Sequence, residues 1–213
     1  MFKNLDLETF IEDLSSEKPT PGGGSVAALV GTLASGLNNM VYSLTVNKKA
    51  FNNLTEEEKS LVLVSIERTK NLKNDFFKAM EEDKNAFEGL MNSYKLPKGT
   101  EEEIGFRNKE IEINTIKALE APLNLARKAL ELYKEIEIGV KYGNKGAISD
   151  AGVSAILTHS TIESAIMNVK INLAYLTNEE FKASVNNEID NILKESIEKK
   201  EMFVGKVYSI IEG

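Results

Sequence analysis

Apolar residues recur along most of the chain at steps of three and four positions, the spacing that places them on one face of a helix. Only four prolines occur in 213 residues, and the sequence lacks the sustained apolar–polar alternation that is typical of strands. The pattern therefore predicts an all-α fold. We expect helices over these approximate ranges: 4–16, 25–47, 56–93, 101–138, 150–175 and 178–211.

Helix starts carry recognisable capping residues. A Thr followed three positions later by Glu can cap one backbone N–H with its hydroxyl, while the carboxylate reaches back to another N–H. This signature occurs three times, at Thr55–Glu58, Thr100–Glu103 and Thr177–Glu180. Ser149 is expected to cap the helix that begins near residue 150. Pro122 removes a helical hydrogen bond to the Ala118 carbonyl and is expected to kink its helix.

Two of the expected helices are rich in small residues, which let helix backbones approach closely. These residues are Ala27, Ala28, Gly31, Ala34 and Ser35 in the first, and Ala151, Gly152, Ala155, Thr158, Thr161 and Ala165 in the second. We therefore expect a helical bundle in which long amphipathic helices surround two central small-residue helices. The composition does not change abruptly, so residues 1–213 are expected to form a single domain. One face of the central pair is expected to pack against a second copy, giving a homodimer.

Composition excludes several classes of function. The net charge of −7 argues against nucleic acid or an anionic membrane as the main partner. The absence of cysteine excludes disulfides and thiolate metal sites, and a single histidine, His159, argues against a zinc site. Residues 19–47 carry no formal charge, which raises the question of a membrane span, but glycines and asparagines interrupt them, so they indicate a helix buried in protein. The start lacks a signal-peptide pattern, so a cytoplasmic location is expected.

A glycine loop precedes the first small-residue helix. It belongs to the run Pro19-Thr20-Pro21-Gly22-Gly23-Gly24-Ser25, where prolines extend the approach and glycines leave the backbone bare. A helix start of this kind presents unpaired backbone N–H groups and the positive end of the helix dipole, so it can receive an anion or a polar ligand. A tight turn without a ligand is the alternative.

Asp83 interrupts an apolar stripe. Phe76, Met80, Phe87 and Leu90 follow one another at helical steps, and Asp83 lies in the middle of the same face. A carboxylate directed into a core is costly unless it is paired, and such groups often have a raised pKa that suits proton transfer. The alternatives are a buried ion pair or a cap for a neighbouring helix.

Three further groups of polar residues are candidates. Asn168 and Asn172 lie four positions apart on a largely apolar helix, so their amides need either a ligand or backbone partners. Asp150 follows a second glycine-containing segment, which includes Asn144. The Asp150 carboxylate either takes part in catalysis or only complements the dipole of the helix that begins there. The third group comprises Lys95, Lys98 and Arg107. Their positive charge suits a small anionic ligand, and the alternative is that they are basic side chains exposed to solvent with no ligand.

Several of these segments together resemble one known family. The quoted run from Pro19 to Ser25 is similar to the opening motif of the cyclodeaminase/cyclohydrolase family. That family includes the C-terminal domain of formimidoyltransferase-cyclodeaminase and stand-alone methenyltetrahydrofolate cyclohydrolases. The other matching segments, in chain order, are Asp83 with Ala86-Phe87, Leu96-Pro97-Lys98, Ala121-Pro122-Leu123, Ser149-Asp150-Ala151-Gly152-Val153 and Asn168-Val169-Lys170-Ile171-Asn172-Leu173.

The resemblance implies an all-helical, dimer-forming enzyme that acts on a one-carbon unit carried by tetrahydrofolate, with no metal or prosthetic group. A stand-alone chain favours methenyltetrahydrofolate cyclohydrolase, which opens 5,10-methenyltetrahydrofolate to 10-formyltetrahydrofolate. Formimidoyltetrahydrofolate cyclodeaminase, which releases ammonia, is the close alternative, and a separate formimidoyltransferase would then be a partner. A non-catalytic folate-binding helical dimer and a signalling-type helix bundle are alternatives of other classes.

The resemblance indicates which residues form the site more strongly than it indicates what each residue does. Asp83 or Asp150 would handle the proton at the reacting carbon, and basic side chains would hold the glutamate tail of the folate. The residues expected to line the pterin or the one-carbon group are Pro21, Gly22, Gly23, Gly24 and Ser25. Those expected to hold the tail are Lys95, Lys98 and Arg107, and those expected at the pterin edge are Asn144, Asn168 and Asn172.

Overall fold

The computed structural model describes residues 1–46 and 48–213, and regular structure in this part of the chain is entirely helical. The helices are η1 (Phe2–Asn4), α1 (Leu7–Leu14), α2 (Gly23–Ser43), α3 (Lys49–Asn52), α4 (Glu56–Tyr94), α5 (Glu101–Tyr142), η2 (Lys145–Ala147), α6 (Ile148–Leu173) and α7 (Glu179–Glu212). The all-α prediction is therefore confirmed. Asn47, the expected end of the second helix, lies outside the described residues.

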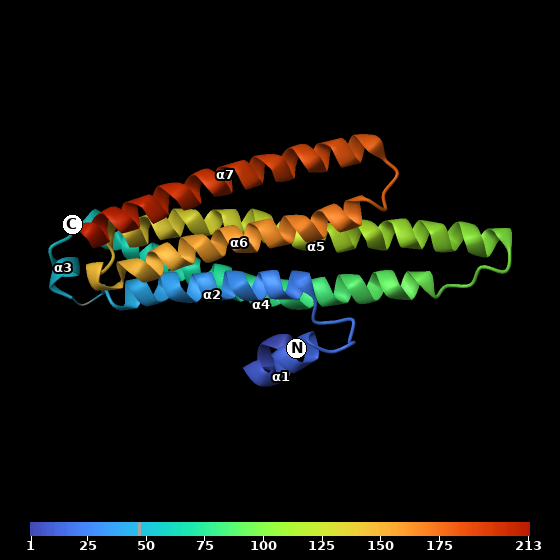
Figure 1. Cartoon of the computed structure of the whole chain (residues 1–213), viewed down its shortest axis with the longest axis horizontal. Helices are drawn as coiled ribbons and strands as arrows, with labels where there is room; N and C mark the ends of the chain where they lie inside the picture. The colour runs from blue at the N-terminus through green and yellow to red at the C-terminus, as the bar shows by residue number, and fades with distance from the viewer. Residues whose placement is uncertain (47) are drawn as a thin grey trace.

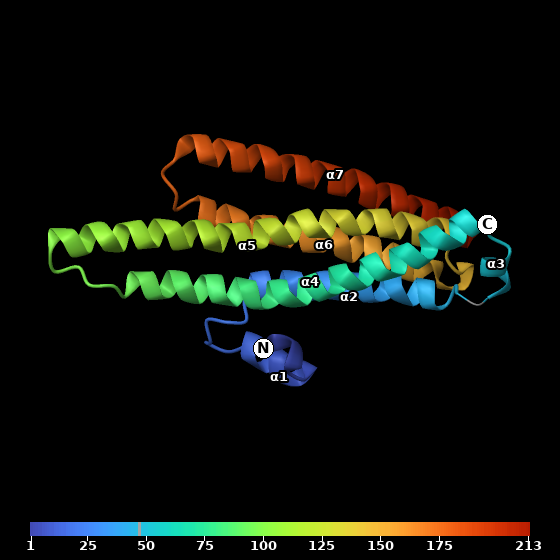
Figure 2. The ribbon, with the colours of Figure 1, turned by 180° about the vertical axis from the view of Figure 1, so that it is seen from behind.

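Four long helices form an elongated bundle. α2, α4, α5 and α6 pack in a ring in that order, and α7 lies along α6 and α5 (Figure 1). The hairpin of α4 and α5 extends beyond the other helices at one end of the bundle, as the view from behind also shows (Figure 2). α1 stands apart from the bundle, beside α2 and α4 (Figure 1). None of the described helices combines the length and the apolar character that crossing a membrane requires.

The small residues of α2 and α6 allow these helices to pack closely. Ala27, Ala28 and Ala34 of α2 are buried, as are Ala151, Ala155 and Ala165 of α6. At Gly31, an added Cβ would lie 3.1 Å from a methyl carbon of Thr161 and 3.2 Å from the ring of Phe76. The prediction of two central small-residue helices is thus confirmed, and the larger apolar residues of α4, α5 and α7 complete the core around them.

Two of the three predicted capping boxes are confirmed. Thr55 and Thr100 each accept the backbone N–H of a Glu three positions on, and that Glu accepts the N–H of the threonine in return. The third prediction is wrong: α7 is capped by Asn178, whose side chain accepts the backbone N–H of Phe181. Asn is at least as good an N-cap as Thr, so the cap falls one residue later than predicted.

The other helix boundaries differ modestly from expectation. Ser149 is not the cap of α6, because that helix already begins at Ile148, directly after the short helix η2. The first helix is shorter than the predicted 4–16, since Asp6 caps it by accepting the N–H of Thr9. α5 continues without interruption through Pro122 to Tyr142. α2 starts at Gly23, two residues before the predicted start, because Asp83 of α4 packs against its first turn in the candidate site.

Candidate functional site

A cavity of about 720 Å³ lies where the N-terminus of α2 meets α4 and the C-terminal end of α6. Its walls are the glycine loop (Gly22–Gly24), Asp83 and Tyr94 of α4, Ala118 of α5, and Asn168 with neighbouring residues of α6. α2 and α6 run antiparallel, so the first turn of α2 lies beside the last turns of α6. The volume is that of a pocket for a small organic ligand.

Asp83 caps α2 from another helix. Gly22 is the N-cap residue of α2 and has no side chain to accept an N–H of the first turn. The Asp83 carboxylate lies against this helix start instead, because it accepts the Ser25 hydroxyl over 2.9 Å, and the Ser25 backbone N–H also favours its charged form. The Ser25 hydroxyl oxygen also lies 3.2 Å from the Met80 carbonyl. The capping alternative for Asp83 is therefore correct, yet the same carboxylate forms part of the cavity wall.

The glycine loop is needed for this close approach. A Cβ at Gly24 would lie only 1.9 Å from Oδ1 of Asp83, a distance that excludes any side chain without displacement of the carboxylate. A Cβ at Gly23 would lie 3.4 Å from Nδ2 of Asn168, which is ordinary contact. Gly24 is thus the residue that lets Asp83 reach the helix start, and α2 consequently begins earlier than a side-chain cap at Ser25 would allow.

The surroundings of Asp83 alter its acidity. Burial raises the pKa of the Asp83 carboxyl above its ordinary value, and the hydrogen bonds from the Ser25 hydroxyl and N–H oppose that rise. Burial disfavours the charged form because the protein replaces solvating water. A carboxyl group with a raised pKa at a cavity wall holds a proton more readily than an ordinary carboxyl group, which suits it to accept and return a proton in general acid–base catalysis.

One face of α6 and the turn after it supply the opposite wall. Asn168, Ile171, Asn172 and Tyr175 line the cavity at steps of three and four residues. The two asparagines were expected from the sequence, whereas Ile171 and Tyr175 were not. Extending the helical spacing onward from Asn168 would have found Ile171, whereas Tyr175 lies beyond the end of α6 at Leu173. Tyr94, at the last residue of α4, is a second aromatic lining residue that the sequence analysis missed.

The three basic residues lie outside the cavity, and two of them neighbour its lining residue Tyr94. Lys95, Lys98 and Arg107 belong to the described part of the chain but are outside the cavity lining. Arg107 comes nearest, because its Nη2 donates to the Tyr94 carbonyl over 3.3 Å and its guanidinium lies 5.9 Å from the centre of the Tyr94 ring. Lys95 is the C-cap residue of α4, directly after Tyr94. The structure therefore places positive charge beside one edge of the cavity.

Two predicted residues lie at the other end of the bundle. Asp150, in the first turn of α6, precedes Asn168 by eighteen residues, about 27 Å of helix. Asn144 uses its side chain structurally, since Nδ2 donates to the Leu44 carbonyl over 3.0 Å and Oδ1 accepts the Gly146 N–H over 2.9 Å. Within one chain, the structure does not bring either residue to the cavity that contains Asp83.

Pro21 and His159 have surroundings of their own. Pro21 is buried, follows a cis peptide bond from Thr20, and lies outside the cavity lining. Nδ1 of His159 lies 2.9 Å from Oγ of Ser196, which lies 3.1 Å from the hydroxyl of Tyr133. This polar cluster joins α5, α6 and α7, and burial lowers the pKa of His159. His159 is therefore a packing residue with a hydrogen-bonded partner.

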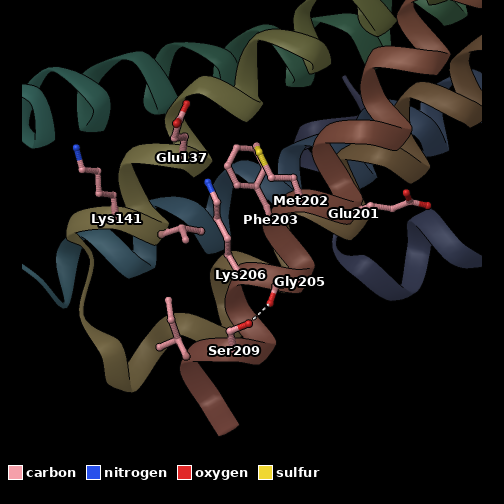
Figure 3. Close-up of a pocket in the computed structure, with 10 residues that line it drawn as sticks. Glu137, Lys141, Glu201, Met202, Phe203, Gly205, Lys206 and Ser209 are labelled. Atoms are coloured by element: carbon pink, nitrogen blue, oxygen red, sulfur yellow. Dashed lines mark hydrogen bonds between the residues drawn. The ribbon is translucent and has the colours of Figure 1, made fainter. Parts of the chain in front are cut away.

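A second cavity of about 760 Å³ lies between the C-terminal halves of α5 and α7 (Figure 3). Its lining mixes both signs of charge, with Glu137 and Lys141 from α5 and Glu201 and Lys206 from α7. The Lys206 ammonium lies 5.6 Å from the ring centre of Phe203. None of the site residues expected from the sequence lines this cavity, so the cavity at the glycine loop is the candidate site.

The fold and this site define an all-helical protein in which bare backbone at a helix start and a half-buried carboxyl share one cavity. Comparison with known families agrees. The Formiminotransferase-cyclodeaminase family profile matches residues 6–191, and the chain belongs to this family.

Individual relatives carry two kinds of name. The chain is 34% identical over 196 residues to the methenyltetrahydrofolate cyclohydrolase of Methylorubrum extorquens, covering 92% of each protein. It is 28% identical over 204 residues to the formimidoyltransferase-cyclodeaminase of Rattus norvegicus, covering 96% of this chain but 37% of that protein. The crystal structure of formiminotetrahydrofolate cyclodeaminase from Thermotoga maritima superposes with a TM-score of 0.80 at 28% identity, covering 100% of this chain and 98% of the other.

Proposed function

We propose that this protein is a methenyltetrahydrofolate cyclohydrolase, which hydrolyses 5,10-methenyltetrahydrofolate to 10-formyltetrahydrofolate. The observation that supports this most directly is the half-buried carboxyl of Asp83 in a cavity of about 720 Å³ beside a bare helix start. The cyclohydrolase of Methylorubrum extorquens supports the same reaction, because the similarity extends over 92% of both chains. A tetrahydrofolate derivative would be the substrate, and no prosthetic group enters the proposal.

The attacking water loses both of its protons in this reaction. In the substrate, a cationic carbon bridges nitrogens 5 and 10, and the oxygen of water forms a bond to it. The Asp83 carboxylate accepts the first proton that this water loses. The resulting tetrahedral carbon bears a hydroxyl group and then breaks its bond to nitrogen 5, which takes the proton from the Asp83 carboxyl. The hydroxyl releases its remaining proton to the solvent as it becomes the carbonyl of the formyl group on nitrogen 10. The negative charge of Asp83 also stabilises the cationic substrate before water adds.

Formimidoyltetrahydrofolate cyclodeaminase activity is the second candidate. The Thermotoga maritima structure of that name, with a TM-score of 0.80, is the observation that favours it. There, nitrogen 10 attacks the formimino carbon and ammonia leaves, so a tetrahedral carbon and one proton-handling carboxyl would again suffice. A separate formimidoyltransferase would supply that substrate. Incubation with each substrate separates the two reactions, since one consumes the methenyl absorbance and the other releases ammonia and creates that absorbance.

The same assay distinguishes an enzyme from a binding protein. We expect the purified protein to accelerate the loss of methenyl absorbance above the rate in buffer. Tight binding of tetrahydrofolate with turnover of neither substrate would instead identify a non-catalytic folate-binding dimer, and would overturn the enzymatic proposal. We further propose that residues 1–213 act as one cyclodeaminase/cyclohydrolase-like domain, because the family profile spans residues 6–191 and one continuous core joins α1 to α7.

The basic edge of the cavity predicts a preference for long glutamate tails. Arg107 and Lys95 lie beside Tyr94 at the mouth, where the carboxylates of a polyglutamate would emerge. We expect a triglutamate substrate to lower KM relative to the monoglutamate, and Arg107→Ala to lose most of this benefit, about threefold to tenfold, because each exposed ion pair is modest. Steady-state kinetics measure it. Lys145→Ala, at the other end of the bundle, is the control, and an equal tail benefit in all proteins would contradict the assignment.

The outer face of α2 and α6 supports a homodimer. Its exposed residues are Leu33, Met40, Val153, Ile156, Met167 and Ile171, and α2 carries no formal charge. Exposed apolar patches of this kind mark interfaces between proteins. We expect the protein to sediment as a dimer and Leu33→Glu to shift it toward the monomer. Leu61→Glu, at an exposed position of α4, is the matched control, and sedimentation of the parent protein as a monomer would contradict the proposal.

A further inference from the structure

Pro122 leaves a carbonyl free inside the cavity wall. A residue at this position of a helix normally donates its N–H to the carbonyl four residues earlier, and proline has no N–H to donate. The carbonyl released in α5 is that of Ala118, which lines the cavity. The side chain of Asn172 takes the vacant place, because its Nδ2 donates to the Ala118 carbonyl over 3.0 Å. A proline in one helix thereby provides a hydrogen-bond acceptor for an asparagine of another.

The partners of Asn172 decide which way its amide faces. Nδ2 also donates to the Asn168 carbonyl over 2.9 Å, so both neighbouring groups are acceptors and only the NH₂ end can face them. The amide of Asn168 is held in the same sense, with Nδ2 donating to the Ser164 carbonyl over 2.9 Å. In the described part of the chain, the hydrogen bonds of both amides use Nδ2 alone. Their Oδ1 atoms are therefore the groups available to a ligand in the cavity that both residues line.

We propose that Pro122 is a positioning residue for substrate binding: it frees the Ala118 carbonyl, which fixes the Asn172 amide so that its oxygen accepts a hydrogen bond from the donor edge of the bound ring. This inference rests on the proposed folate substrate. A reduced pterin carries neighbouring donors on one edge, the 2-amino group and N3–H, and two fixed amide oxygens match that edge. An N–H at position 122 would compete for the Ala118 carbonyl and loosen the amide.

The test compares 5,10-methenyltetrahydrofolate with its analogue lacking the 2-amino group. We expect the wild-type enzyme to lose about tenfold in kcat/KM on the analogue, mainly through KM, as one missing hydrogen bond to a cavity acceptor implies. Pro122→Ala and Asn172→Ala should each reduce this discrimination to about twofold, because each raises KM for the parent substrate and leaves KM for the analogue nearly as it was. Pro97→Ala, in the loop between α4 and α5, is the matched control and should discriminate as the wild type does.

Stability provides an independent readout. A proline inside a helix is unfavourable relative to alanine, so Pro122→Ala should melt at or above the wild-type temperature despite its weaker discrimination. Full discrimination in both variants would overturn the inference, and so would a Pro122→Ala protein that melts lower or fails to fold, because the proline would then serve packing. If the wild type turns over neither folate substrate, the proposed function fails, and the Kd ratio of tetrahydrofolate and its 2-desamino analogue still tests the positioning role.

Discussion

Replacing Asp83 with asparagine is expected to lower kcat for methenyl hydrolysis by roughly 10²–10⁴-fold, the range that a lost general acid–base typically costs. Asparagine keeps the shape of the side chain and an oxygen that can accept the Ser25 hydroxyl, now 2.9 Å from the carboxylate, so the cap of α2 survives. Only the capacity to take and return a proton is lost. Loss of methenyl absorbance under saturating substrate measures kcat directly.

Thermal unfolding of the same variant separates catalysis from capping. Burial raises the pKa of Asp83 above its ordinary value of 3.8, so the native state binds more protons than the unfolded state between the two pKa values. Stability therefore falls as pH rises through that interval, and the ionised carboxylate costs stability at neutral pH. Asp83→Asn lacks this charge, and we expect it to melt at or above the wild-type temperature at pH 7.5, with the advantage disappearing below pH 3.8.

Two other substitutions complete this experiment. Asp190→Asn makes the same chemical change at an exposed position of α7 and should leave turnover unchanged. Asp150→Asn tests the second carboxylate that the sequence suggested, about 27 Å along α6 from Asn168 in the same chain. If Asp83→Asn keeps near wild-type turnover, Asp83 has no part in proton transfer, and if it fails to fold, its role is that of a cap alone.

The sequence predicted the fold more fully than the site because helix periodicity is a local signal. The stripe from Phe76 to Leu90 correctly directed Asp83 inward, and the small residues correctly paired α2 with α6. The two glycine-containing helix starts, in contrast, look alike in sequence. They belong to antiparallel helices, so the start of α6 meets the end of α2, as the bond from Asn144 to the Leu44 carbonyl shows. Local patterns do not say which helix ends share one end of a bundle.

The missed residues follow from the same limit. Tyr94 and Tyr175 occupy the last position of α4 and the turn after α6, where neither hydrophobic periodicity nor capping rules assign a role. They become lining residues only because both helix ends lie beside the first turn of α2. Likewise, the need for glycine at position 24 arises from a carboxylate 59 residues away in the sequence. Contacts of this range depend on the packing of the whole bundle.

Gly24→Ala is expected to remove most of the activity, because its Cβ would overlap the Asp83 carboxylate, which we propose handles the proton in the reaction. The added carbon would lie 1.9 Å from Oδ1 and 2.4 Å from Cγ of Asp83, so the carboxyl must leave the helix start or α2 must shift. Forced repacking of this kind costs roughly 1–3 kcal/mol of stability. We expect kcat/KM to fall by about 100-fold or more, since a general base must stay within hydrogen-bond reach of the water.

Gly36→Ala is the matched control for this substitution in the same helix. Gly36 has nothing within 4 Å of an added Cβ, so alanine there should stabilise α2 by roughly 0.5–1 kcal/mol with unchanged turnover. A second comparison isolates the contact: in an Asp83→Ala background the carboxylate is gone, and Gly24→Ala should cost little further activity and less stability than in the wild type. If Gly24→Ala costs the same stability in both backgrounds, the glycine is needed for the backbone conformation of the loop. The position of the Asp83 carboxylate would then not depend on the absence of a side chain at residue 24.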